Sequence, residues 1–355
     1  MYDRVADLPV TVEDCAFDLR ERATSSGFDR ATTTIVLTGD GVTGRGEDVT
    51  YTNEAHHQLL DHDVDLSGEY TLDSFSAALD DADLWPEPPD EERFHHYRRW
   101  GFESAALDLA LKQADTDLGA ELGREYDPVE FVVSTRLSNP ESDDPPTTDR
   151  LDSLLAIHDD LAFKLDPTPD WDGEFLAALA DYDVRVLDLK GLYETEGVEV
   201  TVDADFYRRV TDALPDALVE DPNLTEETRP VFDGREQRVT WDVPITGVES
   251  IQNLPFEPSV LNMKPSRCST VESVLETIAY CEREGIALYG GGQFELGVGR
   301  DHIQALASLC YPDAANDVAP GGYNDPEAGG DLPASPLDPP AEPRGIGVGF
   351  GRLEN

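Results

Sequence analysis

Positive charge is scarce in this sequence of 355 residues. Lysine and arginine together number 26, against 75 aspartates and glutamates, which gives a formal net charge of −49. A field of that sign repels phosphate groups over long distances. We therefore exclude nucleic acids and anionic membrane surfaces as partners.

Long apolar runs are also missing. No stretch approaches the roughly 18 apolar residues that a membrane-spanning helix needs, and no basic-then-apolar signal peptide opens the chain. The cysteines show no paired metal-binding spacing, so we interpret them as free thiols; they are Cys15, Cys268, Cys281 and Cys310. Hydrophobic residues still make up 39% of the chain, enough for a core. These features predict a globular, cytoplasmic protein.

The acidic residues are spread along the whole chain rather than collected in one tail. Concentrated salt screens the self-repulsion of such a surface, so the composition is typical of a halophile's protein. Lysine occurs only four times, whereas arginine occurs 22 times. Ordinary surfaces carry many lysines, so each of the four needs its own explanation; they are Lys112, Lys164, Lys190 and Lys264.

Strands and helices alternate regularly in the second part of the chain. The first hundred residues mix both, with expected strands at 32–37 and 48–51 around a glycine-rich turn and an amphipathic helix at 100–113. Further strands are predicted at 129–134, 161–164, 184–188, 217–220, 238–242, 259–264 and 286–292, each followed by a helix. In one of these helices a capping box of Ser269 and Glu272 marks the start and Gly285 marks the end. Seven strand–helix units predict a parallel sheet closed into a barrel.

Charged residues stand at the ends of five successive predicted strands. In chain order they are Lys164, Asp188, Glu220, Asp242 and Lys264. The carboxyl ends of parallel barrel strands meet around one site. A charged group at the end of a buried apolar strand faces the barrel mouth or carries a desolvation penalty. We therefore expect these five side chains to share one site.

The chemistry of this set points to a metal-dependent proton transfer. Three converging carboxylates repel each other unless a cation neutralises them, and an all-oxygen set suits Mg²⁺. We predict that Asp188, Glu220 and Asp242 bind one Mg²⁺, with Lys164 and Lys264 on opposite sides of a metal-bound substrate. The cation and partial burial are expected to lower the pKa of the two lysines toward neutrality. A metal on the substrate carboxylate would stabilise the enediolate that forms when the α-proton leaves.

The order Lys, Asp, Glu, Asp, Lys resembles the enolase superfamily, in its muconate-lactonizing-enzyme-like subgroup. The segments 218–222 (LVEDP), 261–264 (LNMK) and 291–299 are similar to strand ends of that family, and 100–113 to its linking helix. The resemblance spans about residues 30–320. It implies an α/β fold, a modified TIM barrel of (β/α)₇β form at 126–320, under an α+β capping domain at 1–125. Residues 321–355 would form a Gly/Pro-rich tail, and cap loops at 24–28 and 50–55 would set specificity.

Several positions depart from the family pattern. Ala162 replaces the first lysine of the usual Lys-x-Lys, and Lys190 replaces the asparagine of Asp-x-Asn. Lys190 either restores the missing charge or faces solvent. The fifth strand lacks the usual Asp-Glu-Ser. We take Asp242 as its metal ligand because it keeps the spacing to Lys264, and Glu249 is the alternative ligand. Glu295 either orients the site or pairs with an arginine.

The resemblance implies a Mg²⁺-dependent enzyme that abstracts the α-proton of a small-molecule carboxylate. The expected outcome is an isomerase, namely a racemase, epimerase or cycloisomerase. The alternatives are a dehydrating lyase such as an o-succinylbenzoate synthase, and a catalytically inactive (silent) barrel that keeps the metal site. We expect a homo-oligomer and no cofactor besides the metal. Cys268, near Lys264 but without a neighbouring histidine in the sequence, is interpreted as a packing residue.

Overall fold

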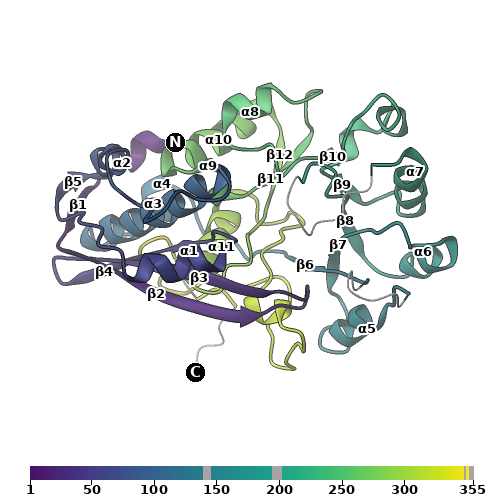
Figure 1. Cartoon of the computed structure of the whole chain (residues 1–355), viewed down its shortest axis with the longest axis horizontal. Coiled ribbons are helices and arrows are strands. Elements are labelled where there is room, and N and C mark those ends of the chain that lie inside the picture. Colours follow the sequence, from purple (N-terminus) through teal and green to yellow (C-terminus); the bar gives the residue numbers. More distant parts are fainter. Residues whose placement is uncertain (139–144, 194–201, 348, 352–355) are drawn as a thin grey trace.

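The N-terminal part of the chain forms an α+β unit at one end of the molecule (Figure 1). The computed structural model describes residues 1–138, 145–193, 202–347 and 349–351. An antiparallel sheet has the strand order β2-β3-β4, and β1 pairs with β5. The elements are η1 (Tyr2–Arg4), β1 (Pro9–Val12), β2 (Asp14–Ala23), β3 (Asp29–Gly39), β4 (Val42–Asp48), α1 (Asn53–Leu60), β5 (Gly68–Thr71), α2 (Leu72–Leu79), α3 (Arg93–Gln113) and α4 (Leu118–Leu122).

The glycine-rich segment at 39–47 contains the predicted turn, which is confined to Asp40 and Gly41, where the φ of Gly41 is 75°. Strand β4 takes up most of the remaining segment, and the expected strand at 48–51 is wrong. Helix α3 packs directly on β4. A Cβ added at Gly46 would lie 1.9 Å from the carbonyl oxygen of Gly101, and one at Gly44 would lie 2.3 Å from that of Ala105. Gly44 and Gly46 therefore serve close helix–strand packing, whereas Gly41 serves the chain reversal.

Helix α3 is longer and more buried than the sequence predicted. It begins at Arg93 rather than at residue 100, and every residue from 100 to 111 is buried. Its neighbours are the cap sheet on one side and α9 of the barrel on the other. A helix covered on all sides needs no polar face, so the amphipathic interpretation of 100–113 is wrong.

Parallel strands alternate with helices from β6 onward, as predicted. Most strands are shorter than expected, and β8 has its predicted bounds. The elements are β6 (Val132–Thr135), α5 (Asp149–Leu155), β7 (Ala162–Leu165), α6 (Gly173–Leu179), β8 (Val184–Asp188), α7 (Ala204–Ala213), β9 (Leu218–Glu220), η2 (Arg229–Val231), η3 (Glu236–Arg238), β10 (Val239–Thr240), α8 (Val248–Gln252), β11 (Val260–Met263), α9 (Pro265–Cys268), α10 (Val271–Glu284), β12 (Ala287–Gly290), α11 (Val298–Cys310) and η4 (Gly321–Asn324).

Two junctions close these strands into a ring. Strands β6 to β10 form one parallel sheet and β11 pairs with β12. The amide of Asn262 donates to the carbonyl of Trp241 at 3.1 Å, which joins β10 to β11. On the other side, Asn316 forms a parallel bridge with Phe131 before β6, and Asp317 forms one with Gly291 after β12. The segment 316–317 thus takes the place of the eighth strand, and the barrel has the predicted (β/α)₇β form.

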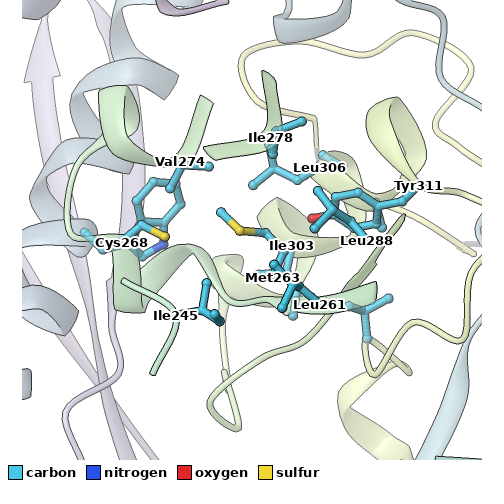
Figure 2. Close-up of a cluster of buried hydrophobic side chains, with 14 of the residues drawn as sticks. Ile245, Leu261, Met263, Cys268, Val274, Ile278, Leu288, Ile303, Leu306 and Tyr311 are labelled. Carbon is cyan, nitrogen blue, oxygen red and sulfur yellow. The ribbon is translucent and has the colours of Figure 1, made fainter. Parts of the chain in front are cut away.

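Apolar side chains fill the space between the last strands and their helices (Figure 2). The labelled members are Ile245, Leu261, Met263, Cys268, Val274, Ile278, Leu288, Ile303, Leu306 and Tyr311. Burial raises the pKa of the Cys268 thiol to about 12, so its interpretation as a packing residue is confirmed. The helix start was placed one residue early, because Thr270 and not Ser269 caps α10; Gly285 ends that helix with a φ of 73°. Within the described residues, no helix has the length and hydropathy needed to cross a membrane.

The segment after residue 321 is largely irregular, as its composition predicted, but it packs on the barrel and cap. Leu337 forms an antiparallel bridge with Val129, and Gly345 forms a parallel bridge with Asp117. Leu337 and Ile346 are buried. The segment therefore covers the region where the cap meets the barrel.

Candidate active site

A pocket of about 390 Å³ opens where the barrel strands end and the cap loops approach them. The barrel contributes charged strand-end residues and the cap contributes aromatic ones. Principal members are Lys164, Asp188, Lys190, Lys264, Phe28 and Tyr51. Phe28 and Tyr51 come from the cap loops at 24–28 and 50–55 that the family resemblance implied. The predicted strand-end lysines therefore face one common space.

Lys164 lies at the end of β7 among three carboxylates. Its Nζ atom is 2.5 Å from Glu220 Oε1, 3.4 Å from Asp317 Oδ2 and 3.7 Å from Asp188 Oδ2. Burial alone would lower the pKa of Lys164, but Glu220, Asp188 and Asp317 outweigh it and hold the pKa well above its usual range. The predicted shift toward neutrality requires a bound cation; with the carboxylates alone, the ammonium form is favoured.

Lys264, directly after β11, has a different partner. Its Nζ atom lies 2.8 Å from Asp242 Oδ2. Arg267 also contacts this carboxylate, with Nε 2.7 Å from Asp242 Oδ1. Against the effect of burial, Arg267 and Lys264 hold the pKa of Asp242 below its usual range, and Asp242 raises that of Lys264. Sequence reasoning missed Arg267, which the helical turn begun by Pro265 brings back over the strand end.

The carboxylates of Asp188, Glu220 and Asp221 form a compact group. All three are buried, and each offers an oxygen within 4.8 Å of the others. Burial raises the pKa of Glu220, and burial together with Asp242 and Glu220 raises that of Asp221 well above its range. Asp242, the predicted third ligand, is outside this group; instead its backbone amide donates to Asp221 Oδ1 at 2.9 Å. Asp221, with φ at 50°, is a site residue that sequence reasoning missed.

Glu220 is also held by two polar residues from β11 and β12. The side-chain amide of Asn262 donates to Glu220 Oε2 at 3.1 Å, and the Tyr289 hydroxyl donates to the same oxygen. Asn262 precedes Lys264 by two residues and therefore shares its strand face. A lone polar residue inside an apolar strand, two positions before the predicted base, was the available signal for Asn262.

Lys190 contacts the first predicted ligand. Its Nζ atom lies 2.8 Å from Asp188 Oδ2 and 3.3 Å from Asp166 Oδ2, and its backbone amide donates to Asp188 Oδ1 at 3.1 Å. Its side chain is 20% exposed. This is the contact expected if Lys190 restores the charge missing at Ala162, and it differs from the solvent-facing alternative.

The other two acidic candidates lie elsewhere. Glu295 accepts the backbone amide of Gln293 at 2.7 Å and pairs with Arg300 Nη2 at 3.3 Å. Glu295 does not line the pocket, so its geometry matches the arginine-pairing alternative. Glu249 lies on α8, whereas Asp242 is in direct contact with Lys264.

The donor set fits a hard divalent cation. Burial, and then repulsion between carboxylates that share one small volume, raise the pKa values of Glu220 and Asp221. Oxygen donors without histidine or cysteine suit Mg²⁺. Asp188 and Glu220 belong both to the predicted set and to the compact group, so they are the core of a candidate metal site.

Two family models match the sequence in succession. The N-terminal domain of DUF8230, a domain of unknown function, matches residues 3–121, and its C-terminal domain matches residues 125–325. The chain belongs to the DUF8230 family. No curated protein matches its sequence.

Comparison with solved structures identifies the fold of this DUF8230 protein. A dipeptide epimerase from Methylococcus capsulatus, complexed with Mg ion, has a TM-score of 0.67 and 18% identity over 95% of this chain and 99% of its own. A muconate cycloisomerase from Pseudomonas fluorescens has a TM-score of 0.65 and 20% identity over 97% of both chains. An enolase-superfamily member from Listeria innocua has a TM-score of 0.64 and 17% identity, over 96% and 95%. The fold is therefore that of the enolase superfamily, as the sequence resemblance predicted.

Proposed function

We propose that this DUF8230 protein is a Mg²⁺-dependent isomerase that removes and returns the proton on the carbon next to a substrate carboxylate. The observation that carries the proposal is the placement of two lysines from distant strands in one pocket above buried carboxylates. The named activities of the similar structures, an epimerase and a cycloisomerase, support an isomerase over a lyase.

The two lysines belong to opposite walls of the barrel. Lys164 lies one residue before the end of β7, and Lys264 directly follows β11. Three strands, β8, β9 and β10, separate β7 from β11. In an eight-membered ring this spacing is half a turn. A carbon held between the lysines would have one amine-bearing side chain on each face, which is what removal from one face and return on the other requires.

Asp188, Glu220 and Asp242 remain the proposed metal ligands. Both carboxylate oxygens of Asp221 already accept backbone amides, from Asp242 at 2.9 Å and Val243 at 3.0 Å. Asp242 is held by side-chain cations, which can move when another cation arrives. A bound Mg²⁺ would supply positive charge beside the substrate carboxylate. The chain's own residues would then hold the substrate between the lysines and move its proton.

Proton exchange in deuterated water tests this function. Carboxylates with an acidic α-proton, including dipeptides, N-acyl amino acids and diacids, are incubated with the protein and followed by proton NMR. We expect loss of the α-proton signal of at least one compound with Mg²⁺, and none after addition of EDTA. Tight Mg²⁺ binding without exchange of any compound would instead support a silent barrel.

A further inference from the structure

Arg136 places a further cation in the wall of the pocket. It directly follows β6 and lines the pocket. Its Nε donates to Asp166 Oδ2 at 3.0 Å, and within the described part of the chain Asp166 is the one hydrogen-bonding partner of the guanidinium. The side chain is 29% exposed. The outer nitrogens of this guanidinium are therefore available to an anion in the pocket.

A short chain of ion pairs connects Arg136 to the candidate metal site. Asp166 accepts from Arg136 at 3.0 Å and lies 3.3 Å from Lys190 Nζ, which in turn lies 2.8 Å from Asp188. The two ends of this chain are separated by only two intervening side chains. A compact ligand can therefore reach the metal site with one end and Arg136 with the other.

The residues that line the pocket include more cations than carboxylates, the opposite of the molecule as a whole. Six cationic side chains line the pocket, against three carboxylates, although the chain carries 75 acidic and 26 basic residues. The cations are Arg93, Arg136, Lys164, Lys190, Lys264 and Arg267. Three further carboxylates, Glu220, Asp221 and Asp242, lie in the same network beneath the pocket. A divalent cation bound among these carboxylates would offset part of their charge, and the cations that line the pocket would then attract an anionic ligand.

One wall of the pocket is aromatic and combines residues of the cap and the barrel. The ring of Phe28 from the cap lies edge to face with that of Phe294, which follows β12, with centroids 5.3 Å apart; Tyr51 of the cap lies 6.5 Å from Phe28. The Tyr51 hydroxyl donates to Gln293 Oε1 at 3.1 Å, which fixes its ring. Such a wall favours an apolar or aromatic body between the charged ends of a ligand.

We infer that the substrate is a dicarboxylate with an apolar or aromatic substituent, and that Arg136 binds its second carboxylate. This inference rests on the proposed function for the role of the first carboxylate, at the metal site. The second carboxylate gives the outer nitrogens of Arg136 a partner that they do not have among the described residues. Binding of a dianion also explains why an otherwise acidic protein keeps three of its four lysines here.

A matched pair of ligands tests the inference. Phenylsuccinate and 2-phenylbutanoate share the α-proton, the phenyl group and the first carboxylate, but 2-phenylbutanoate has a methyl group in place of the second carboxylate. Calorimetric titrations with Mg²⁺ at constant ionic strength should show at least tenfold tighter binding of phenylsuccinate. Arg136→Gln should remove this preference and leave the affinity for 2-phenylbutanoate unchanged within twofold. Arg185→Gln, which removes an exposed arginine on β8, should change neither affinity.

Two results would overturn the inference. The unmodified protein could bind the two ligands with equal affinity, or Arg136→Gln could lower the affinity for both ligands by the same factor. The second result would assign Arg136 only to positioning Asp166 and Lys190. Proton exchange of the same ligands separates this inference from the proposed function. Arginine-dependent binding of phenylsuccinate without any exchange contradicts the isomerase and keeps the dianion site. Exchange of 2-phenylbutanoate as fast as that of phenylsuccinate supports the isomerase and contradicts the dianion site.

Discussion

The four lysines illustrate how the site is built at the scale of single residues. Lys164, Lys190 and Lys264 line one pocket. Lys112 instead contacts Asp108 at 2.6 Å and the carbonyl of Thr43 at 3.1 Å, which ties α3 to the start of β4. Each lysine therefore has a specific partner and none serves only as surface charge. In a chain this acidic, the rarity of lysine was a usable signal for function.

Replacement of Lys190 should affect binding more than chemistry. Lys190→Asn is the suitable variant, because asparagine tolerates the positive φ of 50° at this position. Loss of the ammonium beside Asp188 weakens the attraction for an anionic substrate. We expect KM for the exchanged carboxylate to rise about tenfold, with kcat changed less than about threefold. A large loss of kcat with unchanged KM would place Lys190 in the proton transfer itself.

The third metal ligand can be identified by a pair of variants. Asp242→Asn removes a proposed ligand, so we expect the affinity for Mg²⁺ to fall at least about tenfold in calorimetry. Asp221→Asn should lower it less, because the backbone amides already occupy both oxygens of Asp221. The opposite order would make Asp221 the ligand and Asp242 the partner of Lys264 and Arg267.

The strand-end pattern predicted the lysines and carboxylates that come together, but not the residues around them. Lys164, Asp188, Glu220 and Lys264 all follow from that pattern. Asp317 could not be found in this way, because the segment that replaces the eighth strand is too short for any periodicity. Asp221 directly follows a predicted ligand, and only its positive φ turns its carboxylate into the same group.

At the scale of elements, the contact of α3 with β4 depends on glycine. A Cβ at position 46 would overlap the carbonyl oxygen of Gly101. Gly46→Ala should therefore lower the free energy of unfolding by about 2–3 kcal/mol in urea denaturation. Gly173→Ala is the matched control, because nothing lies within 4 Å of a Cβ there; its effect should stay below about 1 kcal/mol. Equal effects would show that α3 can move away from β4.

Element types were easier to predict than element ends. Strand β8 has the predicted bounds, because its apolar residues Val184, Val186 and Leu187 lead up to Asp188, which ends the strand. Strand β4 was misplaced, since its glycines indicate a turn when the helix that packs on them is unknown. Strand β10 has only two residues, fewer than periodicity can define. In each case the missing information was tertiary packing.

At the scale of the whole molecule, the cap is fixed on the barrel by buried polar contacts. The Glu47 carboxylate accepts the backbone amides of Leu296, Gly297 and Gly299 at the start of α11, at 2.8, 2.9 and 2.7 Å. Arg30 of the cap donates to the carbonyl of Gln293 at 3.0 Å. A carboxylate at a helix start also interacts favourably with the helix dipole. These contacts hold the cap loops, with Phe28 and Tyr51, over the strand ends.

The net charge of −49 predicts that stability depends on salt. Self-repulsion of the acidic surface acts against the compact state, and the Debye length falls from about 10 Å at 0.1 M salt to about 3 Å at 1 M. We expect Tm in differential scanning calorimetry to rise steeply from 0.1 to 1 M KCl. A Tm independent of KCl would contradict the halophile interpretation and leave the active-site account unchanged.

The measurement that tests the central claim most directly is stereospecific deuterium exchange in the two lysine variants. The account assigns Lys164 and Lys264 to opposite faces of one carbon, and a general base typically contributes about 10²- to 10⁴-fold in rate. With an exchanging carboxylate and Mg²⁺ in deuterated water, Lys164→Ala and Lys264→Ala should each retain exchange of only one stereoisomer, and the retained stereoisomer should differ between them. Full exchange of both stereoisomers by Lys264→Ala would contradict the account.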